Sequence, residues 1–129
     1  MEPLSRILHV EDEDDIRTVV GVTLHAIGGF TVLQCASGQE AVEKGPAFAP
    51  QLILLDVMMP RLDGPSTLRA LRATPELTAT PVIFMTAKVQ RQEMAALMDL
   101  GALDVIAKPF DPMTLPRQIK RIWEEKAGK

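Results

Sequence analysis

The stretch LILLDVMMPRLDG, residues 52–64, is the most informative part of this 129-residue sequence. Its first four residues, 52–55, are all apolar, which is typical of a β-strand covered on both faces. A loop containing proline and glycine follows from Met59 to Gly64, and Leu68 and Leu71 then recur at helical spacing. A buried strand, a tight loop and an amphipathic helix together form one β-α unit of a parallel sheet.

The same unit recurs four more times along the chain. We expect further strands at 7–10, 30–35, 82–85 and 105–106, each with few or no polar residues. Apolar residues at helical spacing follow within the segments 16–27, 94–98 and 115–123, and capping residues predict a short helix at 37–45. Five strands separated by helices predict a doubly wound α/β domain, with a parallel sheet and helices on both faces.

Capping and breaking residues mark the helix ends. We expect Asp14 to cap the first helix, and Ser37–Glu40 to form a capping box at the start of the second, which should end near Gly45–Pro46. Asp111 should cap the last helix. Pro116 would then lie one turn inside that helix, where it should cost one hydrogen bond or kink the start.

Length and composition indicate one globular domain over residues 1–129, with no output domain. The apolar fraction of 47% and the charged fraction of 24% exclude a disordered or fibrous chain. The single cysteine excludes an internal disulfide framework and fits a cytoplasmic location, and no apolar run is long enough for membrane insertion. The formal charge of −3 argues against a strongly basic face, so we expect no direct contact with nucleic acid.

The negative charge is concentrated at one place, because five consecutive acids at 11–15 directly follow the first predicted strand. In open parallel sheets, ligands bind beyond the carboxyl ends of the strands. Three carboxylates, one hydroxyl and one ammonium are predicted to converge at that edge. They belong to Glu11 and Asp12 after the first strand, Asp56 after the third, Thr86 after the fourth and Lys108 after the fifth, where Pro109 follows.

Three clustered carboxylates need compensation by positive charge. Unit charges about 4 Å apart repel by roughly 4 kcal/mol at an effective dielectric constant near 20. Such a cluster should therefore raise a carboxyl pKa or recruit a cation. Oxygen ligands with open coordination positions suit Mg²⁺, which keeps water molecules and takes phosphate oxygens. This edge of the sheet is therefore a candidate Mg²⁺ site.

Four segments of the sequence resemble the receiver domains of two-component response regulators, of the chemotaxis-regulator type. They are ILHVEDEDDIR, LILLDVMMPRLDG, PVIFMTA and GALDVIAKPF, in the order and at the spacings of the family, so the resemblance spans essentially the whole chain. It implies a flavodoxin-like (βα)5 fold with strand order 2-1-3-4-5. It also implies a phosphorylation-dependent signalling switch rather than a conventional enzyme.

The resemblance also implies a role for each residue at the sheet edge. Asp56 would accept a phosphoryl group from a phosphohistidine of a sensor histidine kinase or a histidine phosphotransfer protein. Asp12, Asp56 and the main-chain carbonyl of Met58 would ligate Mg²⁺, with Glu11 acting through water or at the edge of the shell. Lys108 would neutralise charge on the transferring oxygens, and Pro109 in a cis peptide bond would orient Lys108. The Thr86 hydroxyl and the N–H of Ala87 would bind the new phosphoryl group.

The sequence departs from the family pattern at several positions. Val105 stands where the family usually carries a tyrosine or phenylalanine whose rotamer reports phosphorylation, and valine has no ring to move. Glu11 replaces the commoner aspartate and is one methylene longer. Met58 and Lys88 occupy the two positions that help set the lifetime of the phosphoryl group, and neither can orient water as a carboxylate or amide would. We therefore expect slow self-dephosphorylation.

Two alternatives compete with the switch. A phosphatase of the haloacid-dehalogenase type also forms an aspartyl phosphate, but it needs a second acid two residues after the nucleophile, where this chain has Met58. A pseudo-receiver, which binds partners without phosphorylation, would be expected to lack Asp56, Asp12 or Lys108, and all three are present. The output stays open between an unknown downstream protein partner, a further part of a longer polypeptide from which this domain is cut, and a relay to a histidine phosphotransfer protein.

Overall fold

A computed structural model describes residues 2–127 of the chain. Its centre is one sheet of five parallel strands: β1 (Arg6–Val10), β2 (Thr31–Cys35), β3 (Leu52–Asp56), β4 (Val82–Thr86) and β5 (Asp104–Ala107). They lie in the order β2-β1-β3-β4-β5, which confirms the expected doubly wound arrangement.

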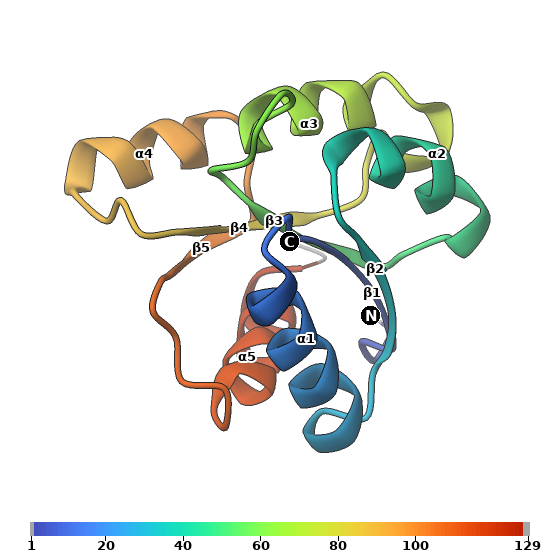
Figure 1. The fold of residues 1–129 in the computed structure, drawn as a ribbon, viewed down its shortest axis with the longest axis vertical. Coiled ribbons are helices and arrows are strands. Elements are labelled where there is room, and N and C mark those ends of the chain that lie inside the picture. The colour runs from blue at the N-terminus through green and yellow to red at the C-terminus, as the bar shows by residue number, and fades with distance from the viewer. Residues whose placement is uncertain (1, 128–129) are drawn as a thin grey trace.

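Helices cover both faces of this sheet. They are α1 (Asp14–Val22) continued by a π-helical turn (Thr23–Ile27), α2 (Gly38–Phe48), α3 (Gly64–Arg72), a 3₁₀ turn (Pro75–Leu77), α4 (Arg91–Asp99) and α5 (Leu115–Lys126). Figure 1 shows α1 and α5 on one face and α2, α3 and α4 on the other. Within residues 2–127, no helix combines the length and the apolar content needed to cross a membrane.

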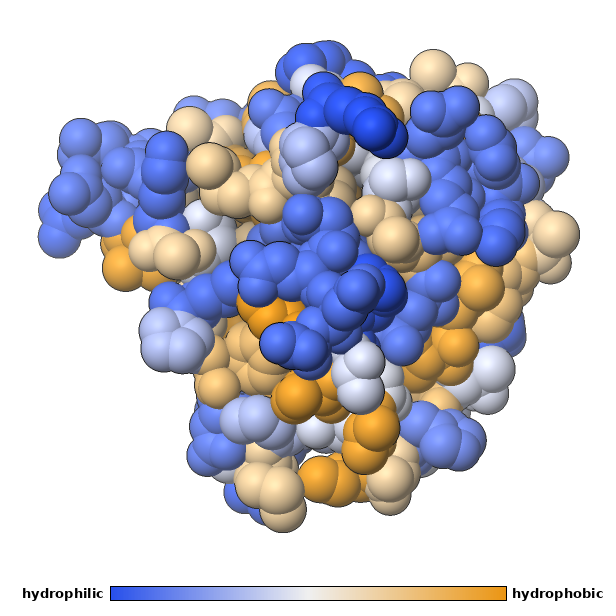
Figure 2. Space-filling view, in the orientation of Figure 1, coloured by the Kyte–Doolittle hydropathy of each residue, from blue (hydrophilic) through white to orange (hydrophobic). Residues whose placement is uncertain are grey.

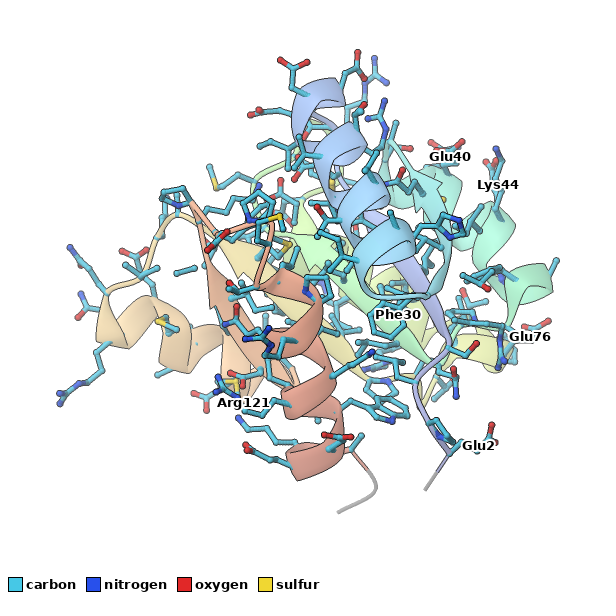
Figure 3. All side chains as sticks on the ribbon, turned by 90° about the horizontal axis from the view of Figure 1, so that it is seen from below. Glu2, Phe30, Glu40, Lys44, Glu76 and Arg121 are labelled. Carbon is cyan, nitrogen blue, oxygen red and sulfur yellow. The ribbon has the colours of Figure 1, made fainter. Side chains whose placement is uncertain are left out.

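Each face of the sheet carries its own apolar core, because successive side chains of a strand point to opposite faces. Leu8 and Val10 of β1 join the core under α2, α3 and α4, whereas Ile7 joins the core under α1 and α5. Phe30 belongs to the second core and is 2% exposed. In Figure 3 its ring lies between the end of the π-helical turn and α5, with Lys120 Nζ 5.4 Å from the ring centre.

The start of α2 confirms the Ser37 half of the expected capping box, whereas Glu40 bonds the main chain at Ala36, one residue before the cap. Ser37 Oγ accepts a hydrogen bond from the Glu40 N–H at 3.1 Å, and Glu40 Oε1 accepts one from the Ala36 N–H at 2.6 Å. Glu40 also pairs with Lys44 one turn later, at 2.9 Å between Oε2 and Nζ (Figure 3). Ser37 thus satisfies one main-chain donor that the helix itself leaves free.

Two other helix ends differ from the expectation. Glu13, not Asp14, is the N-cap of α1, and Asp14 is the first helical residue. The second helix continues beyond Pro46 to Phe48, because proline this close to the end removes only one intrahelical bond. Ala49, in the left-handed conformation, then closes the helix by donating its N–H to the Gly45 carbonyl at 3.1 Å.

The expectation that Pro116 lies one turn inside the last helix is wrong. Asp111 caps a separate turn instead of α5, since its Oδ1 accepts from the Met113 N–H at 2.9 Å. The helix begins at Leu115, so Pro116 is its second residue. A main-chain N–H at that position has no intrahelical acceptor, so its absence costs no hydrogen bond.

His9 is buried in the middle of β1 without solvent exposure. Its Nδ1 lies 2.9 Å from Gln34 Nε2. An amide nitrogen only donates, so Nδ1 accepts and the ring is neutral, with its hydrogen on Nε2. Burial, reinforced by the charges of Lys108 and Arg17, lowers the pKa of His9 from 6.5 to about 3.

This buried histidine predicts an acid-sensitive stability. Between pH 6.5 and about 3, the unfolded state binds the proton of residue 9 and the folded state does not. His9 should therefore make the free energy of unfolding fall as the pH falls through this window, by up to about 1.4 kcal/mol per pH unit. Urea unfolding at a series of pH values should show a shallower dependence in His9→Gln. An identical slope in both proteins would contradict the prediction.

Candidate functional site

The carboxyl ends of β1, β3 and β5 bring four charged side chains together. Glu11 and Asp12 directly follow β1, Asp56 ends β3, and Lys108 directly follows β5. One carboxylate oxygen of each acid lies within 4.8 Å of those of the other two. Glu11, Asp12, Asp56 and Lys108, named here the acidic cluster, meet because parallel pairing aligns the strand ends.

Lys108 bridges two of the acids. Its Nζ donates to Glu11 Oε1 at 2.9 Å and to Asp56 Oδ1 at 2.6 Å. Its main-chain N–H donates to the Thr86 carbonyl at 2.8 Å, which fastens the end of β5 to the end of β4. The peptide bond between Lys108 and Pro109 is cis.

Burial dominates the electrostatics of the cluster. Glu11 is 1% exposed and Asp56 is 4% exposed. Loss of solvation raises the pKa of both carboxyls, and the hydrogen bonds from Lys108 oppose this rise without cancelling it. Burial by itself would lower the pKa of Lys108, but its bonds to Asp56 and Glu11 outweigh that effect and raise it. Lys108 therefore stays charged, and the cluster contains three carboxyl groups but only one ammonium group.

The loop after β3 is held by main-chain bonds that fix the position of Asp56. The Val57 N–H donates to the Met85 carbonyl at 3.0 Å, and the Gly64 N–H donates to the Val57 carbonyl at 2.9 Å. A Cβ at position 64 would lie 2.6 Å from the Asp56 carbonyl oxygen, so only glycine allows this approach. Asp63 then caps α3 with its side chain.

The remaining predicted site residues lie at or just after the ends of β3 and β4 and within β5. Thr86 ends β4, is 1% exposed, and accepts a hydrogen bond at Oγ1 from the Lys88 N–H at 3.0 Å. Ala87 is exposed, and Met58 is 59% exposed in the loop after β3. Val105 is buried in the core under α2, α3 and α4.

The rest of the acidic run lies outside the cluster. Asp14 and Asp15 are exposed in the first turn of α1, where the helix dipole favours negative charge. The Glu13 N–H donates to Glu11 Oε2 at 3.2 Å, while the Glu13 side chain is exposed. Figure 2 shows hydrophilic residues gathered in the middle of this face of the molecule, over the start of α1.

Arg17 contacts the cluster as well, although its place at the end of the segment ILHVEDEDDIR predicted no role for it. Its Nη1 donates to the Glu11 carbonyl at 2.9 Å and to the Asp12 carbonyl at 3.3 Å. Its charge could have indicated this contact, because Arg17 is the only lysine or arginine between Arg6 and Lys44 and follows the acidic run.

The acidic cluster fits a hard divalent cation. Three carboxylates supply the oxygen ligands that Mg²⁺ prefers. Asp12 Oδ1 is buried and has no hydrogen-bond partner within the described residues 2–127. A buried polar atom without a partner is costly, and a metal ion at the cluster would satisfy it.

Comparison with known proteins identifies relatives of this chain. Residues 7–120 match the family model of the response regulator receiver domain. Over 117 residues the chain is 35% identical to the alkaline phosphatase synthesis transcriptional regulatory protein PhoP of Bacillus subtilis, an alignment that covers 91% of this chain and 48% of PhoP. The chain spans about half, or less, of the length of the curated relatives that it matches.

Solved structures agree with the family match. The chemotaxis protein CheY4 of Vibrio cholerae is 29% identical with a TM-score of 0.84, over 92% of this chain and 98% of CheY4. The receiver domain of the sensor histidine kinase PA1611 from Pseudomonas aeruginosa, which has a magnesium ion in its active site cleft, is 32% identical with a TM-score of 0.79, over 92% of this chain and 96% of that domain. Together with the shared strand order and the family match over residues 7–120, these likenesses establish that the chain belongs to the response regulator receiver domains of two-component systems.

Proposed function

We propose that this receiver domain accepts a phosphoryl group on Asp56 from a phosphohistidine of a sensor histidine kinase or a histidine phosphotransfer protein. Receiver domains are signalling switches, and response regulators receive phosphate from histidine kinases and act on downstream partners. One observation carries the proposal: Asp56 is 4% exposed, lies 2.6 Å from Lys108 Nζ and shares a cluster with two more acids. An aspartate with only a structural role would not need a lysine and two further carboxyl groups beside it.

The transfer would proceed by attack of Asp56 on phosphorus. A carboxylate oxygen forms the new P–O bond while the P–N bond to the donor imidazole breaks, and the electron pair of that bond stays on the imidazole nitrogen. The product is an acyl phosphate. Lys108 would offset negative charge on the transferring oxygens, which is the main form of catalysis in phosphoryl transfer.

We infer that Asp12, Asp56 and the main-chain carbonyl of Met58 would hold Mg²⁺. Glu11 already accepts from Lys108 through Oε1 and from the Glu13 N–H through Oε2, which suits a role through water. When bound, the ion would neutralise charge on the phosphoryl oxygens.

The signal would leave the site through Thr86 and α4. Thr86 Oγ1 now accepts from the Lys88 N–H, and the hydroxyl and the Ala87 N–H would bind the new phosphoryl group. Leu97, itself 7% exposed, is the only buried residue of α4, so few contacts oppose displacement of this helix. Because Val105 has no ring to move, the output would rely on displacement of residues 86–94, whose changed surface a downstream protein or a phosphotransfer protein reads.

The first prediction concerns the phosphoacceptor. With Mg²⁺ and acetyl phosphate, the protein should gain the mass of one phosphoryl group, and Asp56→Asn should gain none because the nucleophile is gone. Intact-mass spectrometry measures this gain, and thermal unfolding verifies that the variant is folded. Labelling that survives in Asp56→Asn would refute the assignment.

A second prediction concerns the lifetime of the phosphoryl group. Neither Met58 nor Lys88 can orient an attacking water as an amide does. Met58→Asn should therefore speed the decay of labelled protein by about tenfold, less than the roughly hundredfold or more typical of a general base, because an amide orients the water without taking its proton. Met113→Asn is the matched control, since Met113 is also exposed but lies beyond β5, in the turn before α5. Equal decay rates in the two variants would reject this role of Met58.

A third prediction concerns the charge repulsion that destabilises the cluster in the absence of Mg²⁺. The charge of Asp12 helps to raise the pKa of Asp56, which reflects repulsion between the two groups. Without Mg²⁺, Asp12→Asn should therefore raise Tm, by about 4 °C for a gain of about 1 kcal/mol. The same variant should lose the rise in Tm that Mg²⁺ produces in the natural protein.

Asp15→Asn is the matched control for this experiment. Asp15 belongs to the same acidic run, but it is exposed and lies outside the cluster. It should keep the response to Mg²⁺ and show no gain in Tm, because it removes a favourable charge at a helix start. Destabilisation by Asp12→Asn in the absence of Mg²⁺ would show that repulsion in the cluster is not the dominant effect.

A further inference from the structure

We propose that Arg17 is a positioning residue for the metal side of the site: its guanidinium holds the main chain of Glu11 and Asp12 and thereby places their carboxylates for Mg²⁺. This inference rests on the proposed function. It starts from the contacts of Nη1, which donates to the Glu11 carbonyl at 2.9 Å and to the Asp12 carbonyl at 3.3 Å. The other terminal nitrogen, Nη2, pairs with the carboxylate of Asp14, and the Arg17 side chain is 23% exposed.

The two carbonyls lie where the main chain has left β1 and has not yet entered α1. The Glu11 N–H is still paired, because it donates to the Cys35 carbonyl of β2 at 3.0 Å. The first helical bond of this region runs from the Arg17 N–H to the Glu13 carbonyl at 2.9 Å. The carbonyls of Glu11 and Asp12 fall between these two regular patterns, and the Arg17 side chain satisfies both. Their orientation is therefore set by a side chain reaching back from α1.

Arg17 is itself anchored to the sheet. Gln34 of β2 donates through Nε2 to the Arg17 carbonyl at 2.7 Å and to His9 Nδ1 at 2.9 Å, so both amide hydrogens are used. Gly21 leaves the room that this amide needs, since a Cβ there would lie 2.4 Å from Gln34 Oε1. The first turn of α1 is thus fixed to β1 and β2 at Arg17, whose side chain holds the main chain of Glu11 and Asp12.

Charge and positioning predict opposite effects, which makes the proposal testable. A positive charge near the cluster repels Mg²⁺, so its removal should tighten binding if charge were all that mattered. If Arg17 positions the loop, its removal should weaken binding, because groups that orient metal ligands typically contribute tenfold or more to metal affinity. The sign of the change therefore separates the two roles.

The experiment is a calorimetric Mg²⁺ titration of the natural protein and of three variants. Arg17→Met keeps the aliphatic stem and should raise the Kd for Mg²⁺ about tenfold. Arg17→Lys keeps the charge without the planar fork and should raise the Kd by less. Arg69→Met is the control, because Arg69 is an exposed arginine on α3 that bonds Ser66, and its Kd should match that of the natural protein.

Gly21→Ala tests the anchor without any change of charge. The new methyl group should push the Gln34 amide away from the Arg17 carbonyl, since the end of a flexible side chain yields before the main chain does. Alanine is a better helix former than glycine, so α1 itself should not weaken. The Kd for Mg²⁺ should rise about threefold, an intermediate loss because the guanidinium remains. Thermal unfolding confirms that each variant is folded, and Arg17→Lys and Gly21→Ala decide the matter if Arg17→Met does not fold.

The outcomes separate this inference from the function on which it rests. Natural protein that is labelled on Asp56 and binds Mg²⁺, with Kd values raised in Arg17→Met and Gly21→Ala, supports the positioning role. The same natural protein with an unchanged or lower Kd in Arg17→Met overturns that role and leaves the proposed function intact. Natural protein that neither binds Mg²⁺ nor is labelled on Asp56 overturns both.

Discussion

The bridge from Lys108 to Glu11 and Asp56 is the interaction on which the site depends. Two carboxylates that are 1% and 4% exposed would repel strongly without a cation between them. Lys108 follows β5, which does not border β1 or β3, so its long side chain reaches past the end of β4 to both acids. The hydrogen bond from the Lys108 main-chain N–H to the Thr86 carbonyl fixes the main chain from which this side chain extends. The strand order therefore determines the chemistry at the sheet edge.

The two sides of the site are held very differently. On the metal side, the loop after β1 is tied down by Cys35, by the Arg17 guanidinium and by Gln34 behind it. On the side through which we propose that the signal leaves, Leu97 is the only buried residue of α4. Main chain with few buried contacts opens at lower free energy than main chain held by packing and hydrogen bonds. Such a division suits a switch, because metal ligands gain from rigidity and a signalling surface gains from displacement.

Local patterns in the sequence predicted the elements but not all of their ends. Four apolar residues in a row at 52–55 identified β3, because a strand covered on both faces has no polar side to show. Helix ends depend on backbone angles that a residue type does not set by itself. Asp14 resembles a cap but lies inside α1, and Pro116 is harmless because α5 begins one residue before it.

By itself, the sequence determined the order of the elements and which residues stand at the strand ends, because both follow from periodicity of two or 3.6 residues and from chain order. It therefore placed Glu11, Asp12, Asp56 and Lys108 at one edge. Only the tertiary structure decided what these residues contact. Lys108 meets Glu11 across 97 positions, and Gln34 meets His9 across 25. Such partners depend on strand register and on the path of each side chain, which no local pattern contains. The same reason hid Arg17, whose acceptors are main-chain carbonyls that every residue carries.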